Sequence, residues 1–178
     1  MSVIDKIHMF QYYNLITMKG EIVIYGSTFM ANFPFYELIQ NQLFSNAIYN
    51  RSIEGLTLAD AELGLQSCVI EIRPKKLFLS LGEHDLDNPC ALEIYDRILQ
   101  RIQERCPGCQ VFLLPVANNT PPAQTFNKNL RKLANTYAAR YLDIRYKNNT
   151  DDPRRIFRQM TPFLRTGEIS ITDIMDIH

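Results

Sequence analysis

The chain has 178 residues, of which 46% are hydrophobic and 21% charged, and its 19 basic and 19 acidic residues give a formal net charge of zero. This composition is typical of a globular protein that forms one domain, 1–178, around a hydrophobic core. It lacks the basic excess of a nucleic-acid binder. No apolar run reaches membrane-spanning length, and the N-terminus has no export-signal pattern. We therefore expect a cytoplasmic protein with neither nucleic-acid nor membrane partners.

The predicted elements alternate along the chain between helices and strands. The N-terminal segment is expected to be a helix over 2–17, with Ser2 and Asp5 spaced as in a capping box. Short apolar runs bounded by turn residues predict strands covered on both faces, at 21–25, 46–50, 76–81, 110–116 and 140–144. Apolar stripes of helical period predict the helices between them, within 57–72, 91–105 and 122–139.

Strands that alternate with helices indicate right-handed βαβ units and a parallel sheet. The predicted fold class is therefore α/β, a three-layer α/β/α sandwich with a five-stranded parallel sheet of flavodoxin-like type. A short helix is also expected just beyond Pro34, in the amphipathic stretch FYELIQNQLF.

Two of the four cysteines form a CPGC motif, Cys106 to Cys109. A thioredoxin-like CxxC motif follows a strand and opens a helix, whereas this one follows a predicted helix and precedes a strand. We therefore interpret Pro107-Gly108 as a helix-ending turn, with reduced thiols on either side. No second Cys/His pair has the spacing of a zinc site. With no phosphate-binding glycine loop either, neither a metal nor another cofactor is expected.

Polar segments follow the first four predicted strands, and the first three of these segments contain glycine. They are Gly26-Ser27-Thr28, Asn50–Gly55, Gly82–Asp85 and Val116–Pro122. The carboxyl ends of parallel strands lie at one edge of the sheet, where ligands bind in this class of fold. One such segment alone would be explained by the needs of turns and helix caps. Four of them together favour a pocket for a small-molecule ligand.

These segments resemble the motif blocks of the SGNH, or GDSL-type, hydrolases, a superfamily of esterases and acylhydrolases. In that family a Gly-Asp-Ser block after the first strand carries the nucleophilic serine. An N-x-x-I-x-G block after the second supplies an oxyanion-hole glycine amide, and the asparagine of a G-x-N-D block after the third completes the hole. A D-x-x-H block near the C-terminus supplies the base and its acid. The first three blocks are matched in order within residues 21–90, which implies an esterase-type fold and an ester substrate.

The first two blocks give candidates for the nucleophile and the oxyanion hole. Gly26, Ser27 and Thr28 match the first block, so the resemblance puts Thr28 at the nucleophile position. Ser27, in the neighbouring aspartate slot, is a second candidate, and both hydroxyl residues are alternatively caps of the following helix. Gly55, at the end of NRSIEG, matches the oxyanion glycine.

The third block is matched with one substitution. Gly82 and Asp85 stand at the family's glycine and aspartate, but His84 replaces the asparagine. The resemblance implies that His84 lies at the oxyanion hole, although its ring would present an N–H differently from an amide. Asn118, in the loop after the fourth predicted strand, completes the expected pocket.

The remaining departures concern the attacking hydroxyl and its base. The methyl group of Thr28 stiffens the side chain and crowds the trajectory of attack. The D-x-x-H block is missing, and the only histidine in the C-terminal third is His178. A hydroxyl without a base is not activated near neutral pH. The alternative bases are His84, His178 and His8. If they are not bases, His84 is an ordinary loop residue, His178 a chain end and His8 a residue on the surface of a helix.

Two functional hypotheses follow. The residues favour an esterase relative that is weakly active or inactive and keeps a ligand pocket. The alternative is an active hydrolase of small esters or acetyl esters that uses Thr28 or Ser27 with a non-standard histidine base. Under the first hypothesis, Thr28→Ser alone is not expected to restore activity.

The C-terminal segment, 145–178, is expected to diverge from the family. It should contribute no histidine to the site from 145–169, since this stretch contains none. We expect a helix that is capped by Asp151 or Asp152 and runs through RRIFRQM to Pro162, with inward-facing Ile156, Phe157 and Met160.

Overall fold

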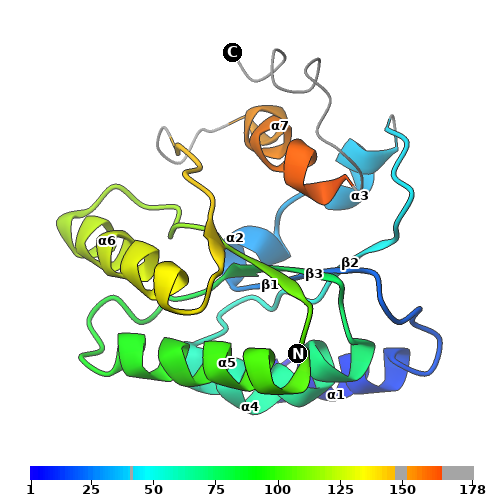
Figure 1. Ribbon diagram of the computed structural model, residues 1–178, viewed down its shortest axis with the longest axis horizontal. Helices are drawn as coiled ribbons and strands as arrows, with labels where there is room; N and C mark the ends of the chain where they lie inside the picture. The colour runs from blue at the N-terminus through cyan, green and yellow to red at the C-terminus, as the bar shows by residue number, and fades with distance from the viewer. Residues whose placement is uncertain (41, 147–151, 166–178) are drawn as a thin grey trace.

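The computed structural model describes residues 1–40, 42–146 and 152–165 (Figure 1). The elements are, in chain order, α1 (Val3–Tyr13), β1 (Ile22–Gly26), α2 (Thr28–Ala31), α3 (Phe35–Ile39), β2 (Ile48–Asn50), α4 (Leu58–Cys68), the 3-10 helix η1 (Ile70–Ile72), β3 (Lys76–Ser80), α5 (Ala91–Arg105), β4 (Gln110–Leu113), α6 (Pro121–Thr136), β5 (Arg140–Tyr141) and α7 (Pro153–Leu164).

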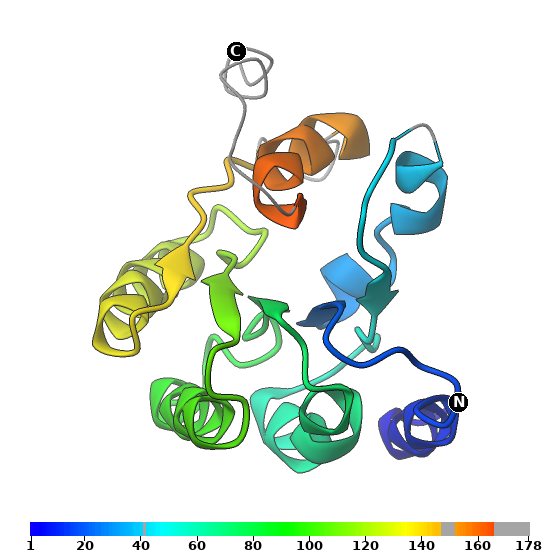
Figure 2. The same cartoon turned by 45° about the vertical axis from the view of Figure 1, so that its right-hand side comes forward.

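The strands form a five-stranded, all-parallel sheet in the order β2-β1-β3-β4-β5. Its side chains alternate between two buried clusters. Val23 and Tyr25 of β1 pack with α1, α4, α5 and α6, whereas Ile22 and Ile24 pack with α2, α3 and α7. Figures 1 and 2 show these helices as layers on the two faces of the sheet. The predicted three-layer α/β/α fold with five parallel strands is therefore confirmed.

Several local predictions are also confirmed, with shifted boundaries. Ser2 caps α1 and forms the predicted capping box with Asp5, but the helix ends at Tyr13 rather than at 17. Four of the five strands are shorter than predicted, most of all β5 with its two residues, whereas β1 has the expected five residues shifted by one. The helix after Pro34 ends already at Ile39.

The predicted C-terminal helix is present as α7. Its N-cap is Asp152, whose side chain accepts a hydrogen bond from the Arg154 N–H, and the helix ends at Leu164. Its inward residues Ile156, Phe157 and Met160 are buried against the sheet, as expected from their spacing. Residues 147–151 and 166–178 lie outside the described residues, and with them His178 and the alternative cap Asp151.

The CPGC motif is the predicted turn between a helix and a strand. α5 ends at Arg105, the Cys109 N–H donates to the Cys106 carbonyl, and Gly108 has a positive φ of 86°. Burial raises the pKa of the Cys109 thiol to about 12 and also raises that of Cys106. Thiolates, rather than thiols, are the reactive species. A redox role for this motif is therefore not favoured.

The same environments predict which thiol reacts with an aromatic disulfide reagent at pH 7.5. Cys90 is exposed, whereas Cys68 is buried and has its pKa raised to about 12 by that burial. We expect one fast phase from Cys90 and slow reaction of the other thiols. Stopped-flow absorbance of wild type and Cys90→Ser measures this, and a fast phase that survives Cys90→Ser would contradict it.

Gly82 is the position where the fold demands glycine most strictly. Its φ is +102°, and a Cβ built there would lie 2.4 Å from Cζ of Phe126. Phe126 belongs to the buried face of α6, so its ring has little room to move. The start of the loop after β3 is thereby pressed against α6.

We expect Gly82→Ala to lower the free energy of unfolding by about 2–3 kcal/mol, through overpacking and backbone strain. Gly20→Ala is the matched control, because Gly20 also has a positive φ but nothing within 4 Å of its added Cβ. Urea denaturation of both variants measures the difference. Equal losses would show that backbone strain alone, and not Phe126, sets the requirement for glycine.

Candidate functional site

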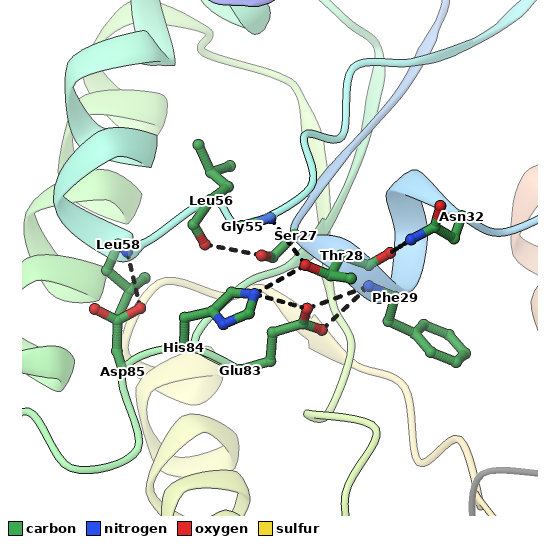
Figure 3. A network of polar contacts seen from close by, with 10 residues as sticks. All are labelled: Ser27, Thr28, Phe29, Asn32, Gly55, Leu56, Leu58, Glu83, His84 and Asp85. Atoms are coloured by element: carbon green, nitrogen blue, oxygen red, sulfur yellow. Dashed lines mark hydrogen bonds and ion pairs between the residues drawn. The ribbon is translucent and has the colours of Figure 1, made fainter. Parts of the chain in front are cut away.

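The candidate site lies where β1 ends. Thr28 is the first residue of α2, and its Oγ1 accepts a hydrogen bond of 2.8 Å from the Gly55 N–H. The same oxygen lies 2.9 Å from Nε2 of His84 (Figure 3). The structure thus brings together three of the residues selected from the sequence. They come from the segments that follow β1, β2 and β3.

Strand order explains this meeting. β1 lies between β2 and β3, so the loops that follow these strands flank Thr28. The loop after β2 stays in register with β1, because the Ile53 N–H donates to the Gly26 carbonyl. Gly55 has a φ of +75°, a backbone conformation that glycine adopts without strain. In this conformation its N–H points toward Oγ1 of Thr28. A Cβ on Gly26 would lie 2.8 Å from the Ser80 carbonyl oxygen, so this strand end requires glycine.

The loop after β3 is held on both sides of His84. Asp85 is buried, and its carboxylate accepts a hydrogen bond of 2.9 Å from the Leu58 N–H at the start of α4. The Asp85 N–H in turn donates to the Gly82 carbonyl and closes a tight turn. The role of Asp85 is therefore to anchor the loop. The His84 side chain is 40% exposed, so its ring is open to solvent and to a ligand.

Sequence reasoning missed Glu83, which lies beside this hydroxyl–imidazole pair. Its two carboxylate oxygens accept the Phe29 N–H, at 3.2 and 3.3 Å, and its Oε1 lies 3.2 Å from Nε2 of His84. Figure 3 shows the carboxylate next to the hydroxyl of Thr28. An acidic residue directly before the histidine in GEHD was the only available signal, and no motif of the family marks that position.

Nε2 of His84 therefore has two competing partners. When this nitrogen carries hydrogen, it donates to the Glu83 carboxylate or to Oγ1 of Thr28. When it is bare, it accepts the Thr28 O–H, and the negative carboxylate then faces its lone pair. Only the bare nitrogen can act as a base. In the familiar hydrolase triads the acid instead binds the other ring nitrogen, Nδ1, which leaves Nε2 free for the nucleophile.

Ser27, the second candidate nucleophile, points away from this pair. It has no exposed surface, and its Oγ donates a hydrogen bond of 2.8 Å to the Leu56 carbonyl. It occupies the N-cap position of α2 but makes no side-chain cap hydrogen bond. A buried hydroxyl that is hydrogen-bonded to a carbonyl cannot contact a substrate without rearrangement. The role of Ser27 is therefore to stabilise the turn between β1 and α2.

The other predicted residues lie elsewhere. Asn118 lines a separate cavity of about 460 Å³ beside β5, with its Oδ1 accepting the Thr120 N–H. His8 is an exposed residue of α1. His178 lies outside the described residues. Within the part of the chain that the structure describes, no three His, Cys, Asp or Glu side chains group as metal ligands, and no helix is long and apolar enough to cross a membrane.

No protein-family model matches the sequence, and no curated protein gives a significant match. Solved structures do match. A protein of Streptococcus pneumonia described as a platelet activating factor superposes with a TM-score of 0.78 at 19% identity, covering 90% of this chain and 91% of its own.

Two further structures are named as hydrolases. A GDSL-like lipase from Bacteroides thetaiotaomicron gives a TM-score of 0.64 at 13% identity and covers 96% of this chain and 93% of its own. An acylhydrolase from Bacteroides fragilis gives 0.66 at 14%, covering 82% of this chain and 79% of its own. At these identities the likeness concerns the fold. The chain has the fold of the SGNH, or GDSL-like, hydrolases.

Proposed function

We propose that the protein hydrolyses small acyl esters, with Thr28 as nucleophile and His84 as its base. The observation that carries this proposal is the 2.9 Å contact between Oγ1 of Thr28 and Nε2 of His84. A hydroxyl within hydrogen-bond reach of a histidine nitrogen is the arrangement that activates a nucleophile. The histidine that stands in place of the family's asparagine thereby supplies the missing base.

The reaction follows from these contacts. Oγ1 of Thr28 attacks the acyl carbon while its proton passes to Nε2 of His84. The ester C–O bond then breaks, and the leaving alcohol takes the proton from the imidazolium. Water, activated by the same nitrogen, attacks the acyl-threonine and releases the acid. The Gly55 N–H, which now binds the Thr28 hydroxyl, is the donor placed to bind the oxyanion.

Turnover by this arrangement is expected to be slow. A histidine that acts as base cannot also serve as the oxyanion donor that the family's asparagine provides. Loss of one such donor typically costs about 100- to 1000-fold in rate. The methyl group of Thr28 adds a steric cost. The weak activity expected from the sequence is thus compatible with a working nucleophile.

The test is to trap the acyl-enzyme. Wild-type protein is mixed with 4-nitrophenyl acetate, quenched in acid and digested, and the acetylated residue is located by mass spectrometry. We expect an acetyl group on Thr28 and none there in Thr28→Val, which keeps the shape of the side chain and removes the hydroxyl. Turnover that persists in Thr28→Val, or acetylation only at surface lysines, would contradict the proposal.

A second candidate function, ligand binding without turnover, is favoured by Glu83. Its carboxylate contacts Nε2 of His84, the nitrogen that would have to act as base, and also accepts the Phe29 N–H. If this contact persists when a ligand is bound, His84 remains a hydrogen-bond donor. The site would then hold an ester without cleaving it.

Glu83→Ala tests whether this carboxylate restrains the base. Removing the carboxylate frees Nε2 to accept the Thr28 proton, so we expect esterase kcat to rise by about 2- to 5-fold, the equivalent of an exposed ion pair. The matched control is Glu54→Ala, which removes an exposed carboxylate from the loop after β2. Steady-state assays with 4-nitrophenyl acetate measure both. A fall in kcat confined to Glu83→Ala would show that the carboxylate assists the base.

A further inference from the structure

Arg51 is a buried guanidinium whose donors are only partly used. It follows β2 directly, and the residue is only 3% exposed. Its Nη2 donates a hydrogen bond of 2.6 Å to Oγ1 of Thr17, and its Nη1 donates one of 3.3 Å to the Phe10 carbonyl. Its Nε is buried and has no hydrogen-bond partner among the described residues.

The charge of Arg51 is also unpaired within the described part of the chain, where no carboxylate lies within ion-pair distance of it. Its guanidinium stands over the rings of Phe10, 4.9 Å from the centroid, and Tyr49, 5.8 Å away. The last turn of α1, where the Phe10 carbonyl lies, adds partial negative charge. These contacts offset the charge in part, but they leave the Nε–H without an acceptor. A buried donor without an acceptor is costly.

A cavity of about 250 Å³ lies against this side chain. Arg51 forms part of its wall, together with Tyr13 of α1, Tyr36 of α3 and Tyr49 of β2. β2 is an outer strand of the sheet, visible at one side of the sheet in Figure 2, and its residues Tyr49 and Asn50 line the cavity. Neither Thr28 nor His84 lines it. The cavity combines aromatic walls with a single desolvated cation.

We propose that this cavity binds a small organic carboxylate. The carboxylate would accept hydrogen bonds from Nε and a neighbouring nitrogen of Arg51, since a guanidinium presents a planar fork that matches a carboxylate. The apolar body of the ligand would lie among the tyrosine rings. One guanidinium matches one negative charge, so a monoanion suits the site better than a phosphate dianion. This inference stands independently of the proposed hydrolase activity, because different residues carry it.

Benzoate and its neutral isostere benzamide are the probes that test the charge requirement. Two-dimensional ¹H–¹⁵N NMR spectra of the full chain are recorded during titration with each. We expect saturable shifts at the amides of Thr17, Tyr49 and Asn50 with benzoate, and binding of benzamide at least about 10-fold weaker, since a hydrogen-bonded charge is worth about 1.5–3 kcal/mol. The positions of the shifted amides distinguish this cavity from the site at Thr28. A carboxylate is also the product of ester hydrolysis, so benzoate could bind there instead.

Variants locate the binding. Arg51→Gln should weaken benzoate binding by about 10-fold or more. Tyr36→Ala, which changes a largely exposed rim residue, should weaken it without loss of fold and keeps the test valid if Arg51→Gln is unstable. The catalytic-site variant Thr28→Val should bind benzoate like wild type. Absence of saturable shifts, equal binding of benzamide, or shifts centred on Gly55 and His84 would each overturn the proposal.

Discussion

His84→Asn is expected to lower esterase kcat by about 10²- to 10⁴-fold, the usual contribution of a general base. The substitution restores the asparagine that the SGNH-type motif carries after the third strand. If His84 served as an oxyanion donor, asparagine would replace it well. Because Nε2 instead lies 2.9 Å from Oγ1 of Thr28, asparagine removes the group that takes the proton. The variant that looks most like the family should therefore be the less active protein.

The measurement is kcat for 4-nitrophenyl acetate, with unfolding curves to confirm that the fold is intact. Thr28→Ser serves as the companion variant. Without the methyl group, kcat should rise by about 2- to 10-fold, the equivalent of the 0.5–1.5 kcal/mol that a strained rotamer costs. The double variant Thr28→Ser/His84→Asn should lose that gain. Equal or higher activity in His84→Asn would show that His84 donates to the oxyanion and that the base lies elsewhere.

Phe78→Ala is expected to lower the free energy of unfolding by about 3–5 kcal/mol, the range for a large side chain removed from a core. Phe78 lies in β3, at the centre of the sheet, with no exposed surface. Its ring stacks on Phe112 of β4, with centroids 4.6 Å apart and an angle of 11° between the planes. The sheet backbone cannot collapse into the space that alanine would leave, so a cavity should remain.

Urea denaturation measures this change, with Leu43→Ala as the control because Leu43 is 98% exposed. That control should change stability by no more than about 0.5 kcal/mol. In native buffer, where Phe78→Ala still folds, the contact between Thr28 and His84 should be kept. The variant should therefore retain most of the esterase activity. A loss below 1.5 kcal/mol would show that α7 and its neighbours move inward and fill the space.

The fold was predictable because its signals are repeated along the chain. Five short apolar runs separated by amphipathic stretches specify parallel strands with helices between them, whatever the exact ends of each element. The boundaries were less predictable. β5, expected over 140–144, keeps only Arg140 and Tyr141, because pairing with a neighbouring strand, and not hydrophobicity alone, decides where a strand ends.

The site was predictable in its residues but not in their contacts. Motif position selected Thr28, Gly55 and His84, and the strand order then placed them together. Whether the histidine takes the place of the asparagine or of the base depends on its side-chain direction, which no sequence pattern specifies. Glu83 and the cavity at Arg51 were not predicted, because each depends on side chains that meet across separate elements.

The order of the first three strands also has a consequence for how the chain is used. The groups that meet at Thr28 all come from its first half, between β1 and the loop after β3. Under the proposed function, in which His84 is the base, the reaction needs no base from a more distant segment of the chain. α7 packs Ile156, Phe157 and Met160 against the sheet, so hydrophobic packing constrains the sequence at these positions.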